Sequence, residues 1–258
     1  MSIKLAKELE SFANLWIDGY FEGDPLDPIG QSTYGQLSYV SVLHATYLRC
    51  IRPYINSNTI SLEIGPGRGA WTKTLLGSKE VYALDALPAE HNKFYEYLGH
   101  PKNVFYQQVR GFDCNFLPED YFDFMLSFGC LCHVSFEGIT KYAVNLYPKL
   151  RFGSNCFWMI ADYNKYNLAI ANLGRLSYWN IFLRKNNLFI LNYFLKNMIR
   201  RNKPSLLSLV EDDTPSPGRW YNAGIERTCS MLESVGYRIV DPDVGTCLRD
   251  PIIHFMKS

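Results

Sequence analysis

The stretch that decides the fold is Thr59–Asp85, TISLEIGPGRGAWTKTLLGSKEVYALD. It predicts a strand, a glycine-rich turn, a helix over about 70–76 and a second strand that ends in a carboxylate. The glycines allow a sharp turn and the close approach of a ligand, and the N–H groups that begin the helix face that ligand. A carboxylate in the position of Asp85 can bind ribose hydroxyls. The stretch therefore predicts a nucleotide site.

Two cofactors fit this pattern. Gly65, Gly67 and Ala70 satisfy the dinucleotide fingerprint, in which alanine can replace the last glycine. Glu63 followed by three alternating glycines more closely resembles motif I of the class I S-adenosylmethionine (SAM) methyltransferases. The alternative is that the turn has a purely structural role and only packs a helix on a strand. The correctly spaced carboxylate argues against this alternative.

The composition is that of a folded globular protein. Its 258 residues are 47% hydrophobic and 15% aromatic, which suffices for one large α/β domain with an added cap. The net charge of +1 gives no reason to expect a nucleic-acid partner. The N-terminus lacks the apolar core of a signal peptide, and no window reaches the ~18 apolar residues of a membrane span. Seven scattered cysteines without CxxC spacing predict reduced thiols in the cytoplasm and no metal centre.

The remaining chain alternates between strands and helices, which predicts a parallel sheet covered on both faces. The predicted strands after the first two span 104–109, 122–127 and 155–162, and the predicted helices span 88–98 and 136–150. Near the C-terminus, a helix over 221–235 precedes two short strands at 237–240 and 252–256. A helix followed by such a hairpin resembles the end of the class I methyltransferase fold, where the last strand inserts antiparallel. This ending favours SAM over a nicotinamide cofactor.

The resemblance covers roughly 59–162 and 221–257 and implies an α/β, Rossmann-like fold with a mostly parallel seven-stranded sheet. Residues 1–58, with predicted helices at 3–20 and 38–54, then imply a helical N-terminal cap over the cofactor. The alternative is that these helices only cover the edge of the sheet. The methyltransferase domain proper would span 59–258.

A second departure from the minimal pattern is predicted at 163–220, as an inserted helical lid. Its apolar stripes are interleaved with lysines and arginines, and no acid occurs between Asp162 and Glu211. An ordinary solvated face is one interpretation of these charges. The other is attraction of an anionic acceptor, or peripheral contact with a membrane surface that carries one.

The resemblance also implies which residues bind the cofactor. In class I methyltransferases an acid just after the third strand binds the adenine amino group, and Asp113 stands at the matching place. Trp71 is a candidate for the pocket wall because aromatic faces favour a sulfonium, although a core position is an equal alternative. The predicted cofactor-binding residues are Glu63, Gly65, Gly67, Gly69, Trp71, Asp85, Asp113, Cys114 and Ser127.

The segment after the fourth strand, SFGC (127–130), indicates the kind of acceptor. Enzymes that methylate base or amide nitrogens usually carry Asn/Asp-Pro-Pro-aromatic there, so nucleic-acid methylation is disfavoured. A hydroxyl acceptor needs a base, and His133 is the first candidate, with helix capping or packing as its alternative. Asp162 is the second, as base, orienting group or metal ligand. The predicted acceptor-binding residues are Tyr34, His44, Arg219 and Trp220.

Three further stretches resemble bacterial methyltransferases that modify capsular or lipopolysaccharide sugars: GDPLDPIGQSTYG (23–35), CLCHVSFEGITKYAVNLYPKL (130–150) and RWY (219–221). This resemblance implies O-methylation of a hydroxyl, phosphate or phosphoramidate oxygen on an anionic saccharide or phosphorylated precursor. Three alternatives stay open: an N-methyltransferase for a small amine or lipid head group, a SAM-binding subunit without catalysis, and a nicotinamide oxidoreductase.

Overall fold

The computed structural model describes residues 8–12, 15–29, 36–37, 40–175 and 220–258. Their centre is a seven-stranded sheet in the order β5-β4-β3-β6-β7-β9-β8. The strands are β3 (Ile60–Ile64), β4 (Glu80–Asp85), β5 (Val104–Gln108), β6 (Phe122–Ser127), β7 (Leu150–Met159), β8 (Tyr237–Asp241) and β9 (Ile252–Lys257). The first five pair in parallel, and β9 is antiparallel to both β7 and β8. The predicted Rossmann-like methyltransferase fold is confirmed.

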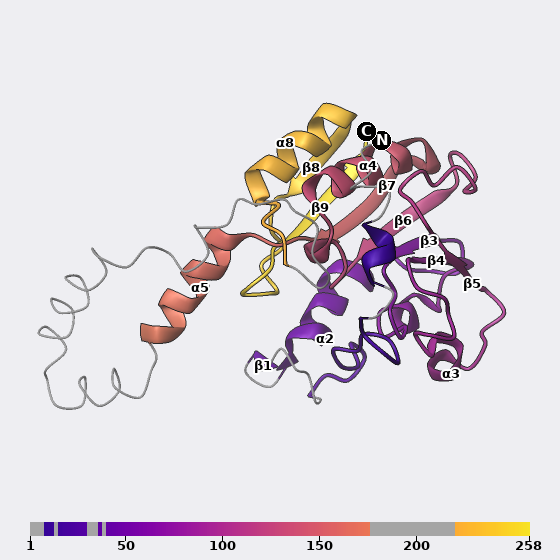
Figure 1. Ribbon diagram of the computed structural model, residues 1–258, viewed down its shortest axis with the longest axis horizontal. Helices are drawn as coiled ribbons and strands as arrows, with labels where there is room; N and C mark the ends of the chain where they lie inside the picture. The colour runs from indigo at the N-terminus through magenta and orange to yellow at the C-terminus, as the bar shows by residue number, and fades with distance from the viewer. Residues whose placement is uncertain (1–7, 13–14, 30–35, 38–39, 176–219) are drawn as a thin grey trace, which may run out of the picture.

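Short helices cover both faces of the sheet (Figure 1). The α-helices are α2 (Val42–Thr46), α3 (Phe94–Leu98), α4 (Phe136–Leu146), α5 (Tyr163–Arg175) and α8 (Ile225–Val235). Shorter turns are η1 (Leu9–Phe12), η2 (Tyr47–Ile51, a π turn), η3 (Thr72–Leu75), η4 (Leu131–His133) and η5 (Tyr147–Lys149), and β1 (Gln36–Leu37) pairs with β2 (Val40–Ser41). Among the described residues, no helix is long and apolar enough to cross a membrane.

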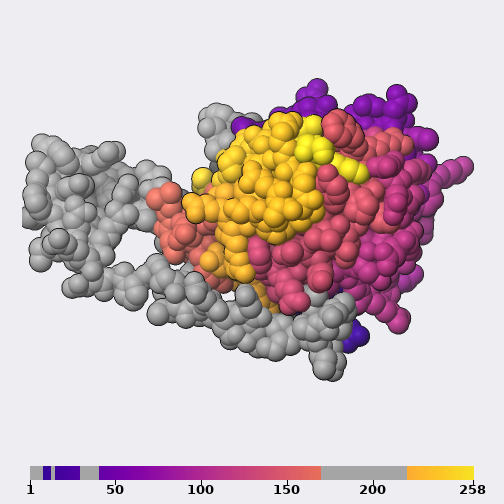
Figure 2. Space-filling view, turned by 90° about the horizontal axis from the view of Figure 1, so that it is seen from above, coloured from indigo at the N-terminus to yellow at the C-terminus, as the bar shows by residue number. Residues whose placement is uncertain are grey.

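Alternation along the strands divides the interior into two cores. In β7, Cys156 and Trp158 face a core that includes residues of α4 and α8, whereas Phe157 and Met159 face a core that includes residues of α2, η2 and α3. In the space-filling view, residues 220–258 form a continuous surface beside α5 (Figure 2). Among the described residues, buried apolar side chains therefore pack on both faces of the sheet.

Several predicted helices are shorter than expected, and residues with a positive φ precede them. Of the helix predicted over 70–76, only the η3 turn is present, after a glycine turn in which Gly67 and Gly69 have φ values of 53° and 99°. Lys93, at φ 49°, delays the predicted 88–98 helix until α3.

The N-terminal prediction needs a larger correction. The predicted helix over 3–20 is reduced, in its described part, to η1 and a turn in which Trp16 and Asp18 have φ values of 48° and 69°. The predicted helix over 38–54 begins only at α2 and continues as the π turn η2. The division into cap, domain and lid stays a prediction, and 176–219 of the lid lie outside the described residues.

Candidate active site

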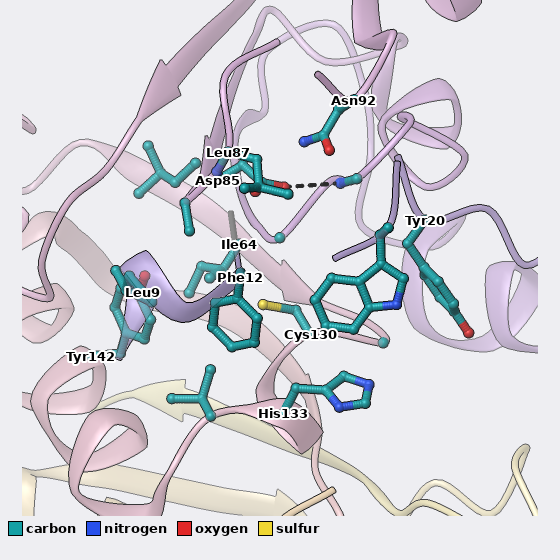
Figure 3. Close-up of a pocket in the computed structure, with 17 residues that line it drawn as sticks. Leu9, Phe12, Tyr20, Ile64, Asp85, Leu87, Asn92, Cys130, His133 and Tyr142 are labelled. Atoms are coloured by element: carbon teal, nitrogen blue, oxygen red, sulfur yellow. Dashed lines mark hydrogen bonds between the residues drawn. The ribbon is translucent and has the colours of Figure 1, made fainter. Parts of the chain in front are cut away.

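The site lies at the carboxyl ends of β3, β4 and β6. The strands β4 and β5 lie on one side of β3, and after β5 the chain crosses to β6 on the other side. Such a switch point leaves a crevice in a doubly wound sheet. The Asp85 carboxylate at the end of β4 accepts hydrogen bonds from the Gly67 N–H at 3.2 Å and the Leu87 N–H at 2.9 Å. The first of these joins the glycine turn to β4 (Figure 3).

A pocket, here called the inner pocket, opens at this crevice. It is bounded by the glycine turn, the segments after β4 and β6, α4 and residues 9–12 and 15–20 of the N-terminal segment (Figure 3). Its lining residues are Leu9, Phe12, Trp16, Tyr20, Ile64, Gly65, Gly67, Leu84, Asp85, Ala86, Leu87, Asn92, Gly129, Cys130, His133, Val134 and Tyr142. Apolar walls with a few placed polar groups are typical of a cofactor site.

Two of the three glycines in this lining, Gly65 and Gly67, are needed because other parts of the chain approach them closely. Gly65 has a φ of 71°, and a β-carbon there would lie 2.3 Å from the Cys130 side chain. At Gly67, a β-carbon would lie 2.8 Å from the Tyr20 carbonyl oxygen. The turn therefore brings together segments on either side of the pocket.

The N-terminal segment is fixed onto this turn by polar contacts. The Arg68 N–H donates to the Tyr20 carbonyl oxygen at 3.1 Å, and Arg68 Nε donates to the Asp18 carbonyl oxygen at 2.8 Å. The Lys73 ammonium pairs with Asp24 at 2.7 Å. Phe12 and Tyr20 of the same segment lie among the pocket side chains in Figure 3. The segment thus forms one wall of the inner pocket.

Three carboxyl groups surround the glycine turn, and burial raises the pKa of each. The pKa of Asp85 rises to about 6, although the N–H groups of Leu87 and Gly67 oppose this shift. Behind the turn, burial raises the pKa of Glu63 to about 8 and that of Glu22 to about 7. Thr72 Oγ1 donates to Glu63 at 2.6 Å. At neutral pH these raised pKa values keep Glu63 mostly protonated and Glu22 about half protonated, so Asp85 is the carboxylate of this group that offers a negative charge to the pocket.

A second depression, here called the outer pocket, adjoins the inner one. Its lining consists of Leu15, Trp16, Tyr20, His133, Tyr166, Trp220 and Arg249. Trp16, Tyr20 and His133 line both pockets. The His133 ring lies on η4 and packs against the Trp16 ring, with 5.1 Å between centroids. The imidazole therefore stands at the boundary between two ligand spaces.

Five predicted residues line these pockets. They are Gly65, Gly67, Asp85 and His133 in the inner pocket, with His133 and Trp220 in the outer one. Four other predicted cofactor residues lie in or near the glycine turn but do not line either pocket: Glu63, Gly69, Trp71 and Ser127. Trp71 Nε1 donates to Glu22, and its ring packs on Phe128. Ser127 Oγ donates to the Ile64 carbonyl oxygen at 3.0 Å.

Two predicted cofactor residues after β5, Asp113 and Cys114, lie outside the lining of the inner pocket. Asp113 is exposed and lies outside the lining of the inner pocket, while Phe112 before it and Cys114 after it are buried in the core. Neighbouring residues of an irregular segment point to opposite sides, and here the apolar pair takes the inner side. The predicted contacts of Asp113 and Cys114 with the cofactor do not fit this arrangement.

Asp162, the second candidate base, does not face either pocket. One carboxylate oxygen accepts from the Lys165 N–H at 2.7 Å and the other from the Ile225 N–H at 2.8 Å. It thus satisfies N–H groups in the first turns of α5 and α8 and lines neither pocket. Within the described ranges no cluster of three or more metal-ligating side chains occurs.

The acceptor-side predictions had mixed outcomes. His44 lies outside both pockets, where its Nδ1 is 2.9 Å from the Pro25 carbonyl oxygen. Tyr34 and Arg219 lie outside the described residues. Arg249 and Tyr166, which do line the outer pocket, were not predicted because no local motif marks them. Phe12, Trp16 and Tyr20 did carry a signal, since aromatic residues recur there every four positions.

Comparison with known proteins identifies the domain. Residues 62–153 match the protein family described as methyltransferase domain, a range that holds the glycine turn, Asp85 and His133. A candidate SAM-dependent methyltransferase from Listeria monocytogenes is similar in structure, with a TM-score of 0.52, 12% identity and coverage of 84% of this chain and 98% of that one. Comparison with curated proteins gave no match.

A second similar structure is the N-methyltransferase NodS from Bradyrhizobium japonicum in complex with S-adenosyl-L-homocysteine. It has a TM-score of 0.51 and 12% identity, with coverage of 84% of this chain and 87% of that one. Likeness at this identity concerns the fold. Together with the domain match, it confirms the predictions of a methyltransferase and of SAM as methyl donor.

Proposed function

We propose that this SAM-dependent methyltransferase transfers the methyl group to an oxygen of a saccharide or phosphorylated precursor, with His133 as the base. The observation that carries the proposal is the position of His133, which lines both the inner and the outer pocket. A residue at that boundary can contact a donor on one side and an acceptor on the other.

The residues of the inner pocket fit SAM. Asp85 at the end of β4 suits ribose hydroxyls, and the apolar side chains of Leu87 and Tyr142 suit an adenine ring. The aromatic rings of Trp16 and Tyr20 suit a positively charged sulfonium. When bound, SAM supplies an electrophilic methyl group on that sulfur.

His133 would act on the acceptor. A hydroxyl is a poor nucleophile until its proton is removed, and a neutral imidazole can accept that proton as the oxygen forms its bond to the methyl carbon. The Trp16 ring restricts the rotation of the imidazole, which helps to hold it in one orientation. Positioning of donor and acceptor in adjoining pockets supplies much of the rate enhancement for such a displacement.

The acceptor class is supported by the walls of the outer pocket. Trp16, Tyr20, Tyr166 and Trp220 provide ring faces against which a sugar can pack. The sequence resemblance to enzymes that modify bacterial surface polysaccharides points to the same class. We place the reaction in the cytoplasm as part of this proposal, and contact between the basic 163–203 segment and a membrane surface stays a prediction.

The test is a methyl-transfer assay with SAM and a panel of sugars, sugar phosphates and nucleotide sugars. His133→Gln should lower kcat about 10²- to 10⁴-fold and remove the loss of activity in acid that protonation of the base causes. His100→Gln, on an exposed histidine beside Tyr95, is the matched control and should leave both unchanged.

Three results would contradict the proposal. Methylation of amines with little effect of His133→Gln would indicate an N-methyltransferase, which needs no strong base. SAM binding without any methylated product across the panel would indicate a non-catalytic subunit. Binding of NADH but not SAM in a calorimetric titration would indicate an oxidoreductase.

A further inference from the structure

We propose that Arg249 is the anion-binding residue of the outer pocket, where it holds a phosphate or carboxylate group of the acceptor while the reacting hydroxyl lies at His133. This inference rests on the proposed O-methyltransferase function. It assigns to the acceptor a specific chemistry, a ring that carries an oxyanion, and assigns its recognition to a residue between β8 and β9.

Arg249 reaches the pocket through the antiparallel pairing of β9. The next two residues, Asp250 and Pro251, lead directly into that strand, and the Ile160 N–H donates to the Pro251 carbonyl oxygen at 3.1 Å. This bond holds the connection beside the end of β7. The Arg249 side chain keeps 44% of its surface exposed while lining the pocket, so a ligand can reach its guanidinium.

Contacts with Asp250 and Trp220 help to hold the guanidinium in place. Its Nε donates to Asp250 Oδ2 at 2.7 Å, and a terminal nitrogen pairs with the same oxygen at 2.5 Å. On its other side, the guanidinium carbon lies 5.2 Å from the centre of the Trp220 ring. A side chain held in this way loses less conformational freedom when it binds a ligand.

The charges favour an anion. Of the described residues that line the outer pocket, Arg249 alone carries a permanent charge. Its counter-ion Asp250 has a side chain that is only 2% exposed, whereas that of Arg249 is 44% exposed, so of the two charges the guanidinium is the more accessible to a ligand. The planar fork of arginine also matches the paired oxygens of phosphate and carboxylate.

The placement of Arg249 fits the reaction geometry. Arg249 and His133 line the same pocket, and Trp220 and Tyr166 lie in that lining with them. An acceptor anchored at Arg249 and packed on these rings would present its other end to His133. Binding energy from a group remote from the reacting atom is then used to position the hydroxyl.

The experiment compares matched acceptors: a neutral hexose, the corresponding hexose phosphate and the corresponding hexuronate. Arg249→Gln should raise KM for the two anionic compounds about 10- to 100-fold, with kcat and the KM of the neutral hexose changed less than about threefold. Arg249→Lys should restore part of the affinity for phosphate, which binds well to a point charge, and less of that for carboxylate. Arg238→Gln, on an exposed arginine of β8, is the control.

A binding measurement separates this inference from the proposed function. Inorganic phosphate is titrated into the protein saturated with S-adenosylhomocysteine, with and without Arg249→Gln, and calorimetry records the affinity. Loss of phosphate binding in the variant supports the inference even where no methylated product forms. Methylation of hydroxyl acceptors with equal KM changes for neutral and anionic compounds overturns it.

Because Arg249→Gln leaves the buried Asp250 without its arginine, the variant Arg249→Gln/Asp250→Asn is measured as well. It removes the charge and its counter-ion together, so folding is preserved more easily. Unchanged phosphate binding in that folded double variant would also overturn the inference.

Discussion

The inner and outer pockets share three side chains, yet the chain builds them by different means. The inner pocket consists mainly of residues that directly follow β3, β4 and β6, such as Gly65, Asp85 and Cys130. The outer pocket is assembled from Leu15, Tyr166, Trp220 and Arg249, which come from four separate segments. The first depends on regular sheet geometry, and the second on how irregular segments meet.

The charges of the two pockets also differ. Asp85, whose pKa is about 6, lines the inner pocket, whereas Arg249 lines the outer one. A positively charged donor and a negatively charged acceptor would each find the opposite charge in its own pocket. The comparison teaches that a cofactor pocket and an acceptor pocket of opposite charge can share one boundary, here Trp16, Tyr20 and His133.

The largest effect is expected from a substitution that disrupts the inner pocket. Gly65→Ala places a β-carbon 2.3 Å from Cys130 in a residue with φ 71°, so both overlap and backbone strain oppose folding. Urea unfolding should show a loss of about 4 kcal/mol, and calorimetry should show no binding of S-adenosylhomocysteine.

Gly153→Ala is the matched control for this prediction. Gly153 has a φ of 81°, but a β-carbon there meets nothing within 4 Å. Only the strain of the left-handed backbone remains, and a loss of about 1 kcal/mol is expected. Equal losses in the two variants would show that the contact with Cys130 does not determine the need for glycine at Gly65.

The second prediction concerns the border of the outer pocket. Asp162→Ala removes the acceptor for two N–H groups, those of Lys165 and Ile225, and should destabilise the protein by about 2 kcal/mol in urea unfolding. Because Asp162 lines neither pocket, the acid limb of the pH–rate profile should stay as in the wild type. Asp162→Asn keeps one acceptor and should lose about half as much. A lost acid limb in either variant would return Asp162 to the candidate bases.

The third prediction tests which carboxylate binds the donor. Asp85→Asn should weaken S-adenosylhomocysteine binding about 10-fold, because the ribose hydroxyls lose a charged acceptor. Asp113→Asn is the control, since Asp113 is exposed and lies outside the inner lining. Equal losses measured by calorimetry would mean that the adenine edge extends to Asp113, as the sequence resemblance implied.

The fold and part of the inner pocket were predictable because their signals are local. Strand, glycine turn and carboxylate follow one another in the sequence, so Gly65, Gly67 and Asp85 could be placed before any contact was known. His133 followed from its position after β6. The cofactor is confirmed, whereas the assignment of individual residues to it stays a prediction.

The rest depends on contacts between distant segments. Trp71 was predicted as a pocket wall, but Glu22 of the N-terminal segment accepts its Nε1 hydrogen and the ring packs in the core. Arg249 carries no motif, and only the pairing of β9 with β7 brings it beside His133. The N-terminal helix failed because Trp16 and Asp18 adopt left-handed backbone conformations that let the segment cross the crevice.

The smallest expected effect examines how the N-terminal segment is joined to the inner pocket. Burial raises the pKa of Glu22 from its ordinary 4.5 to about 7 in the folded protein. Between these values the folded state holds a proton that the unfolded state releases, so stability falls as the pH rises. The contribution is fully present below about pH 4.5 and is lost as the pH passes through 7.

Glu22→Gln keeps an acceptor for Trp71 but removes the titration. Urea unfolding at pH 5 and pH 6 should therefore show a fall in stability about 1 kcal/mol smaller in this variant than in the wild type, with Glu63 still titrating. Glu10→Gln, on an exposed carboxylate of η1, should follow the wild type. Parallel pH profiles for Glu22→Gln and the wild type would mean that water reaches Glu22 in solution. The segment from Trp16 to Asp24 would then pack on the glycine turn less tightly than its contacts with Arg68 and Lys73 indicate.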